Sequence, residues 1–286
     1  MTSRTNYRSD TLHFEVDAQL IRELGERLVS RNHIGISELI KNSYDADSPL
    51  VEVILSNVTS YDLSQSELTI VDAGSGMSFD TVKNRWMTIG TSNKRNNPIS
   101  PLFGRPVTGN KGIGRFACQR LAERLELKTC AKVENGYEYT NVQFEWDDFE
   151  PGLSLSNVNC SYETYTDAEG EAGTTLRLIG LREHITDRDF KMILKSISLI
   201  SIADQTHRSG FEPDPGFDAT ISAPEFEHLM GDAQFKASKR LLSSGWGTLT
   251  GAINDEGFVY SRFQIISATF MERCRRGSQL LKVVRS

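Results

Sequence analysis

The sequence lacks any run of the ~18 consecutive apolar residues that a membrane-spanning helix requires. The longest candidate, Ile193 to Ala203, is interrupted by Lys195 and by several serines. The first ten residues, MTSRTNYRSD, contain no apolar core and no small-residue cleavage site, so they do not resemble a signal peptide. We therefore expect a cytoplasmic protein with no membrane partner.

Cysteine, histidine and proline are also scarce. The four cysteines, Cys118, Cys130, Cys160 and Cys274, form no CxxC pair, and the five histidines are scattered. This usage is typical of thiols in a reducing compartment and gives no support to a histidine-based metal site. The sequence has 22 glycines but only 8 prolines, so the glycines are positions to examine for function.

Composition and charge narrow the class of protein. The 286 residues are 38% hydrophobic and 24% charged, which is typical of a globular protein and excludes wholesale disorder, collagen and coiled coil. The net charge of −6 argues against non-specific nucleic-acid binding by the whole chain. The stretch from Arg85 to Lys128 differs, with nine Lys or Arg against two Asp or Glu. It fits an anionic ligand or a solvated basic loop equally well.

The order of the predicted elements indicates the architecture. Apolar spacing predicts helices over residues 16–30, 33–47, 79–87, 113–125 and 187–203. Strands are expected over residues 51–55, 68–71, 125–129, 137–144, 153–158 and 174–178, with a strand–turn–strand unit over 246–266. Residues 90–110, rich in Ser, Asn, Pro and Gly, predict a long functional loop. We expect a two-layer α/β sandwich over residues 1–205, then a linker and a partial second domain over 206–286.

The predicted helix ISELIKNSYDAD carries one polar face. With Glu38 at 0° and about 100° per residue, Asn42 lies at about 40° and Asp45 at about −20°. Such a face also fits an amphipathic helix turned to solvent. A carboxylate and an amide one turn apart nevertheless suit a water and a hard cation, because Mg²⁺ prefers oxygen ligands and keeps several waters.

A second candidate site follows the apolar strand predicted over residues 68–71. The sequence IVDAGSGM places Asp72 at the end of that strand, before Gly74, Gly76 and Met77. Two glycines one residue apart allow the backbone to approach a ligand closely. The carboxylate can accept a hydrogen bond from an exocyclic amine such as that of adenine. Taken alone, the pattern also fits an ordinary tight turn.

A third candidate is the glycine-rich segment GNKGIGRF over residues 109–116. Free backbone N–H groups at a helix start bind phosphate, and Lys111 and Arg115 add positive charge. The segment is neither a P-loop, since GxxxxGK[ST] is absent, nor a dinucleotide fingerprint, because a polar loop precedes it. A fourth pattern, GTT, places Thr174 at a strand start, where β propensity alone would also explain it.

In their order, E-x-x-x-N-x-x-D-A, D-x-G-x-G-M, G-x-K-G-I-G and G-T-T resemble the motifs of the GHKL ATPases. This superfamily includes type II topoisomerase ATPase subunits, MutL and MORC proteins, ninety-kilodalton heat-shock chaperones and sensor histidine kinases. The pattern is most similar to the MutL, MORC and chaperone members. The resemblance implies the Bergerat fold of the α+β class, in which helices cover one face of a mixed β-sheet and ATP lies between the helices and a flexible lid.

The resemblance also implies a role for each matching residue. Glu38 would be the general base that orients the attacking water, and Asn42 would bind Mg²⁺. Asp72 would accept from the adenine amine, Asp45 would help to hold the adenine side, and Thr174 would reach Asp72 or a water. The base pocket would be shaped by Gly74, Gly76 and Met77. The lid is expected over residues 88–111, and the contacts expected around the phosphates are Lys94, Lys111, Gly112, Ile113, Gly114, Arg115 and Phe116.

Glu38 favours the ATP-hydrolysing members of the superfamily, because histidine kinases of this fold generally lack that glutamate. We therefore expect Mg²⁺-dependent hydrolysis of ATP to ADP and phosphate, with lid closure and an ATP-dependent homodimer. Residues 246–266 resemble the first hairpin of a transducer-like domain, which in relatives supplies a Lys or Arg to the γ-phosphate; a partner protein is the other source of that cation. The alternatives are an ATP-binding signalling module with little hydrolysis, histidine-kinase-type phosphotransfer, and nucleic-acid clamping, supported by the basic C-terminal tail.

Overall fold

The computed structural model describes residues 13–89, 98–108, 114–200, 208–230, 234–236, 247–253 and 259–265. The chain divides into two compact units, Met1–Lys236 and Ala237–Ser286. Within the described part of the chain, we find no helix that combines the length and the apolar character needed to cross a membrane.

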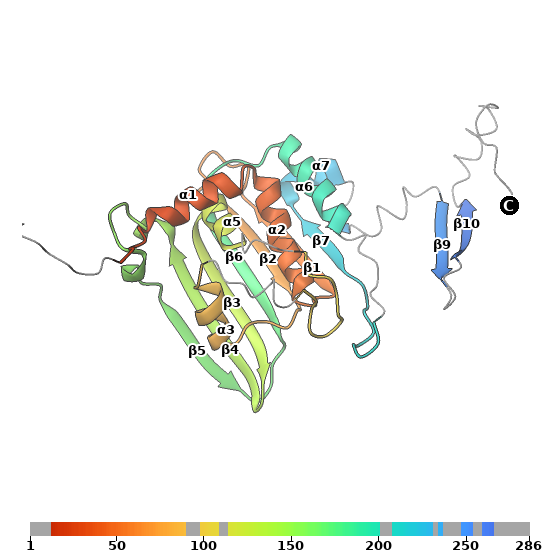
Figure 1. Ribbon diagram of the computed structural model, residues 1–286. Coiled ribbons are helices and arrows are strands. Elements are labelled where there is room, and N and C mark those ends of the chain that lie inside the picture. Colours follow the sequence, from red (N-terminus) through yellow and green to blue (C-terminus); the bar gives the residue numbers. More distant parts are fainter. Residues whose placement is uncertain are drawn as a thin grey trace, which may run out of the picture. The chain divides into compact units, whose positions relative to one another are not determined.

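The first unit is built on an eight-stranded mixed sheet with the order β5-β4-β3-β6-β2-β1-β7-β8 (Figure 1). The pair β1–β7 is parallel and the other six pairs are antiparallel. The strands are β1 (Leu50–Ser56), β2 (Glu67–Asp72), β3 (Ala122–Val133), β4 (Gly136–Glu145), β5 (Tyr162–Asp167), β6 (Gly173–Leu181), β7 (Asp218–Ser222) and β8 (Gln234–Lys236).

Helices cover one face of this sheet, so the α+β two-layer prediction and the Bergerat fold are confirmed (Figure 1). The helix α5 contacts α1 and α2, and α2 also contacts α6. The helical elements are α1 (Gln19–Leu28), α2 (Asn32–Asp45), α3 (Phe79–Thr81), the π-helix η1 (Val82–Trp86), α5 (Gly114–Leu121), η2 (Trp146–Asp148), η3 (Leu155–Asn157), α6 (Asp187–Ile200), η4 (Pro224–Phe226) and α7 (Glu227–Met230).

The core lies between the two layers. In β1, alternate residues are buried, which is the pattern of a strand with one covered face. On α2 the buried apolar residues follow helical spacing, so its polar residues turn away from the sheet. Fully buried side chains from these elements include Val51, Val53, Leu55, Ile36, Leu39 and Ile40.

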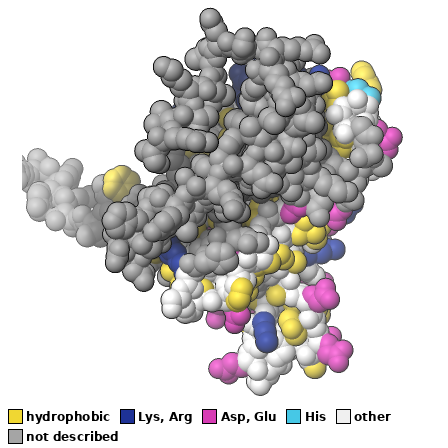
Figure 2. Space-filling view, turned by 90° about the vertical axis from the view of Figure 1, so that its right-hand side faces the viewer, with side chains coloured by type: hydrophobic (Ala, Val, Ile, Leu, Met, Phe, Trp, Pro, Cys, Tyr) yellow, Lys and Arg dark blue, Asp and Glu magenta, His cyan; other side chains and the backbone are white. Residues whose placement is uncertain are grey.

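Figure 2 shows acidic, basic and hydrophobic side chains interspersed where described residues are visible on one side of the molecule. On the sheet, Arg177 lies 2.7 Å from Glu67 and 3.3 Å from Glu126. The hydrogen bond from Arg177 is the main reason that the pKa of Glu67 is lowered.

The structure differs from the predicted helices and strands in three places. The helix expected over residues 113–125 ends at Leu121, and β3 begins directly at Ala122. The strand expected over residues 153–158 is wrong, because Leu155–Asn157 is a turn of 3-10 helix. The strand β5 was missed, because all six of its residues are exposed and no apolar alternation marks it.

The region after α6 also differs from its expectation as a linker. Strand β7 adds Asp218–Ser222 to the first sheet, beside β1, and the first compact unit continues to Lys236. In the second unit, β9 (Gly247–Ile253) pairs antiparallel with β10 (Val259–Ile265), as expected for the strand–turn–strand unit. Its assignment to a transducer-like domain stays a prediction.

A buried arginine joins three distant segments of the first unit. Arg105 is 0% exposed, and both its Nε and Nη2 donate to Asp214 Oδ1, at 3.1 and 2.6 Å. Its Nη1 donates to the Ser48 carbonyl oxygen at 2.6 Å, and its Nη2 to the Gly216 carbonyl oxygen at 2.7 Å. The Tyr44 ring lies 5.0 Å from the guanidinium carbon. A charge so far from water is tolerated because its donors are paired.

Replacing Arg105 with methionine would leave the Asp214 carboxylate buried without its counter-charge. We expect Arg105→Met to lower the free energy of unfolding by about 3–5 kcal/mol. The control Arg22→Met breaks an exposed pair, 3.6 Å from Glu26, and should cost less than about 1 kcal/mol. Urea unfolding followed by circular dichroism measures both variants, and an equal loss in the two would contradict the anchoring role of Arg105.

Candidate functional site

The polar face of α2 carries three of the predicted site residues. Glu38, Asn42 and Asp45 are all half-buried, one turn or nearly one turn apart. Lys41 Nζ donates to Glu38 Oε1 at 2.7 Å, and the two side chains are 33% and 23% exposed. One carboxylate oxygen of Glu38 is thus bound by an ammonium group.

Asp72 stands at the end of β2 and is tied to α2. Its Oδ2 accepts from Ser43 Oγ at 2.9 Å, and its Oδ1 accepts from the Gly74 backbone N–H at 3.0 Å. Burial raises the pKa of the Asp72 carboxyl, and hydrogen bonds from Gly74, Ser43 and Thr174 oppose the rise. A half-buried carboxyl with lone pairs remaining can accept from a further donor such as an exocyclic amine.

The two glycines after Asp72 permit close backbone contact. A Cβ on Gly74 would lie 2.7 Å from the Ala46 carbonyl oxygen. Gly76 has φ +63°, and a Cβ there would overlap the Cys130 carbonyl oxygen on β3. The turn is therefore pressed between the end of α2 and β3, and only glycine fits at position 76 without strain.

Thr129 on β3 links two predicted residues and was missed from the sequence. Its Oγ1 accepts from the Met77 N–H at 2.9 Å and lies 3.1 Å from Thr174 Oγ1. In the strand register Thr174 is also the partner of Asp72. Met77, Thr174 and Asp72 are thus brought together, through a residue that the local pattern of a strand-forming threonine does not single out.

The glycine-rich segment is described only in part. Gly114 begins α5, and a Cβ there would overlap Asn42 Nδ2, so this glycine lies directly against α2. Phe116 is 4% exposed, which suits packing; its proposed contact with a ligand stays a prediction. The side chain of Arg115 and the predicted residues Lys94, Lys111, Gly112 and Ile113 lie outside the described residues.

Thr108 is a second residue that the sequence did not reveal. Its backbone N–H and its Oγ1 both donate to Asp45 Oδ1, at 2.8 and 2.9 Å. It is the last described residue before the glycine-rich segment. Asp45 thus contacts the C-terminal part of the predicted lid, on the same turn of α2 on which Asn42 meets Gly114.

These contacts form two clusters that share α2. One contains Asp72 with Ser43, and the turn that carries it lies against Ala46. The other contains Asn42 and Asp45, facing Gly114 and Thr108. The Asp72 carboxylate thus lies beside α2 as a hydrogen-bond acceptor, and Asn42 and Asp45 place polar atoms of the same helix next to Gly114 and Thr108. This arrangement suits a ligand with an amine at one end and anionic groups at the other.

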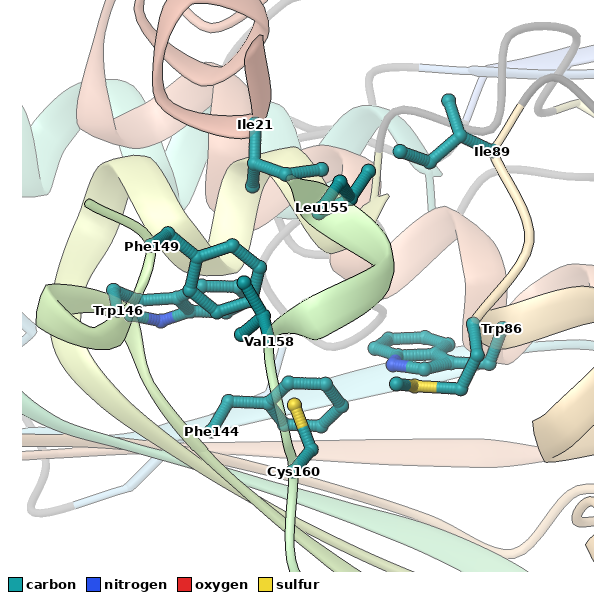
Figure 3. A pocket seen from close by; sticks show the side chains of 10 residues that line it. Ile21, Trp86, Ile89, Phe144, Trp146, Phe149, Leu155, Val158 and Cys160 are labelled. Atoms are coloured by element: carbon teal, nitrogen blue, oxygen red, sulfur yellow. The ribbon is translucent and has the colours of Figure 1, made fainter. Parts of the chain in front are cut away.

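A separate apolar cavity of about 110 Å³ contains none of the predicted site residues (Figure 3). It lies where η1, α1 and the end of β4 meet the segments η2 and η3. Its lining consists of Ile21, Trp86, Met87, Ile89, Phe144, Trp146, Phe149, Leu155, Val158 and Cys160.

Comparisons with known proteins agree with this arrangement. Residues 30–166 match the family described as "Histidine kinase-, DNA gyrase B-, and HSP90-like ATPase". The chain is also 31% identical over 110 residues to a protein from Herpetosiphon aurantiacus named "Putative type II restriction enzyme HgiDII". The aligned segment spans 38% of this chain and 16% of that relative.

Proposed function

We propose that this chain binds ATP with Mg²⁺ and hydrolyses it to ADP and phosphate, because residues 30–166 match the family of histidine kinase-, DNA gyrase B- and HSP90-like ATPases. The observation that carries the proposal is the position of helix α2 between the candidate residues. It joins Asp72, through Ser43, to the face on which Glu38 and Asn42 lie. A single rigid element thus spans the distance from an adenine acceptor to a base for the attacking water.

The adenine end of the proposed site is Asp72. Its carboxyl would accept from the N6 amine, while the backbone of Gly74 and Gly76 and the side chain of Met77 would shape the pocket. Thr174, fixed by Thr129, would reach Asp72 or a bridging water. The raised pKa of Asp72 follows from the burial that a base pocket requires.

The phosphate end would be built from Asn42 and the glycine-rich segment. The amide oxygen of Asn42 is a hard oxygen donor on a half-exposed helix face, so it fits a Mg²⁺ ion that phosphates and waters also bind. The bound ion would neutralise charge on the phosphates. Gly112 and Gly114 would offer their backbone N–H groups, and Lys94, Lys111 and Arg115 would add positive charge.

The chemical step would be in-line attack of water on the γ-phosphorus. The new bond joins the water oxygen to phosphorus, the bond to the β-phosphate oxygen breaks, and ADP leaves. Glu38 would orient the water and take its proton, while Lys41 holds one oxygen of the Glu38 carboxylate. Positioning and charge neutralisation would supply most of the acceleration.

Hydrolysis would drive a conformational switch. ATP would order the lid through charge-assisted hydrogen bonds, and two copies would associate until hydrolysis releases them. The motif pattern supports a hydrolysing member of the MutL, MORC or heat-shock-chaperone kind. A cation for the γ-phosphate would come from the second unit, a second copy or a partner protein, so the isolated chain should turn over slowly.

Glu38→Ala tests the general-base role. We expect ATP binding within about twofold of wild type and a fall of at least about 10²-fold in phosphate release. The matched control Glu26→Ala, on the exposed face of α1, should leave both unchanged. The measurement is steady-state phosphate release together with retention of radiolabelled phosphate on the protein.

Equal turnover in Glu38→Ala and wild type would contradict the general-base role. Label retained on the wild-type protein, with no free phosphate, would favour phosphotransfer of the histidine-kinase type. ATP binding without release or retention of phosphate would favour a nucleotide-dependent signalling module.

A second candidate function is an ATPase that serves a DNA-acting system. It is supported by the similarity to a putative type II restriction enzyme and by the basic stretch from Arg85 to Lys128. Duplex DNA should then raise phosphate release several-fold at low salt and lose this effect at high salt, because phosphate contacts are salt-dependent. A rate that DNA leaves unchanged at low salt would contradict this candidate.

A further inference from the structure

The segment 98–108, inside the predicted lid, is a folded part of the first unit. Ile99 and Pro106 form an antiparallel bridge. The Ser100 N–H donates to the Arg105 carbonyl oxygen at 2.8 Å, and the Val107 N–H donates to the Pro98 carbonyl oxygen at 2.9 Å. Ser100 and Arg105 are both buried. The segment is therefore a closed loop with its own hydrogen bonds.

Asp47 fixes this loop to the end of α2. Its side chain is buried, and its backbone has φ +61°, a conformation that few residues other than glycine adopt. Its Oδ1 accepts from Ser100 Oγ and from the Phe103 N–H, at 2.5 and 3.3 Å, and its Oδ2 accepts from the Leu102 N–H at 2.8 Å. Together with Arg105, these bonds attach the loop to the end of α2.

The loop ends at Thr108, where a second carboxylate of the same helix region holds it. Asp45 Oδ1 accepts hydrogen bonds from both the backbone N–H and the hydroxyl of Thr108. One turn earlier, Asn42 touches Gly114 so closely that no Cβ fits there. Thr108, just before the glycine-rich segment, and Gly114, within it, thus both contact one turn of α2.

We propose that Asp45 is a positioning residue for the phosphates of the nucleotide, acting through Thr108, and does not hold the adenine. This inference rests on the proposed function, since it needs a nucleotide at the glycine-rich segment. Asp45 fixes Thr108, and Asn42 lies against Gly114, so α2 holds the two described residues nearest to this part of the segment. Backbone N–H groups bind an anion best when their position is fixed before the ligand arrives.

The charge of Asp45 supports this reading. A free carboxylate beside a triphosphate would repel it. Here the two donors of Thr108 converge on one oxygen of Asp45, a charge-assisted arrangement that satisfies part of its negative charge. Asp72, in contrast, accepts hydrogen bonds from Ser43, Gly74 and Thr174, so the two carboxylates serve different ends of the site.

The test compares ligands that share adenine but differ in phosphate. Isothermal titration of the full chain, with Mg²⁺, uses adenosine, ADP and a non-hydrolysable ATP analogue. We expect Asp45→Ala to weaken binding of ADP and the analogue about tenfold and to leave adenosine within twofold of wild type. Thr108→Val, which keeps the backbone bond, should show a smaller loss of the same kind, and Thr108→Ser should restore wild-type affinity.

A double variant tests whether Asp45 and Thr108 act through the same interaction. Asp45→Ala combined with Thr108→Val should bind no more weakly than Asp45→Ala alone, because both changes remove one interaction. Thermal unfolding of each variant establishes that it is folded. If Asp45→Ala does not fold, Thr108→Val replaces it in the binding test, because the Thr108 side chain is exposed and its replacement should not disturb the fold.

The outcomes are distinct. An equal loss of adenosine, ADP and analogue binding in Asp45→Ala would place this residue at the adenine end and overturn the inference while the proposed function stands. Unchanged affinity for all three ligands would overturn the inference as well. A wild-type chain that binds none of the three would overturn the proposed function itself.

Discussion

The buried guanidinium of Arg105 is the interaction on which the rest of the first unit depends. It neutralises Asp214 and also takes the carbonyl oxygens of Ser48 and Gly216. A single side chain thus holds together the end of α2, the loop 98–108 and the segment before β7. Removing the partner of such a buried charge would cost several kcal/mol. The three segments are therefore held in one arrangement, which fixes the end of α2 relative to the other two.

The candidate site inherits its geometry from that placement. The helix α2 lies over the sheet with its apolar side buried, which turns Glu38, Asn42 and Asp45 outward. Ser43 ties the same helix to Asp72. Residues 34 positions apart in sequence, Glu38 and Asp72, are thereby held by one element. Two of the four short motifs are therefore joined in the structure by one helix and its hydrogen bond to Asp72.

The sequence predicted what local chemistry determines. The 3.6-residue period of α2 revealed its polar face, and the pair of glycines after Asp72 revealed the close turn that Gly76 requires. Contacts between distant residues could not be predicted, because neither Arg105 nor Asp214 carries any local pattern that names its partner. For the same reason the parallel pairing of β7 with β1 and the link from Thr129 to Thr174 were missed. Strand β5, exposed throughout, had no apolar alternation to mark it.

The central claim is that Asp72 and α2 bind the adenine of Mg·ATP, and calorimetric titration of ATP tests it most directly. The wild-type chain should bind ATP more tightly with Mg²⁺ than without it. Asp72→Asn should weaken binding at least about tenfold, which corresponds to about 1.4 kcal/mol, whereas the control Asp62→Asn, at an exposed position, should not change it. Equal affinity in wild type and Asp72→Asn, or no binding by the wild type, would contradict the account.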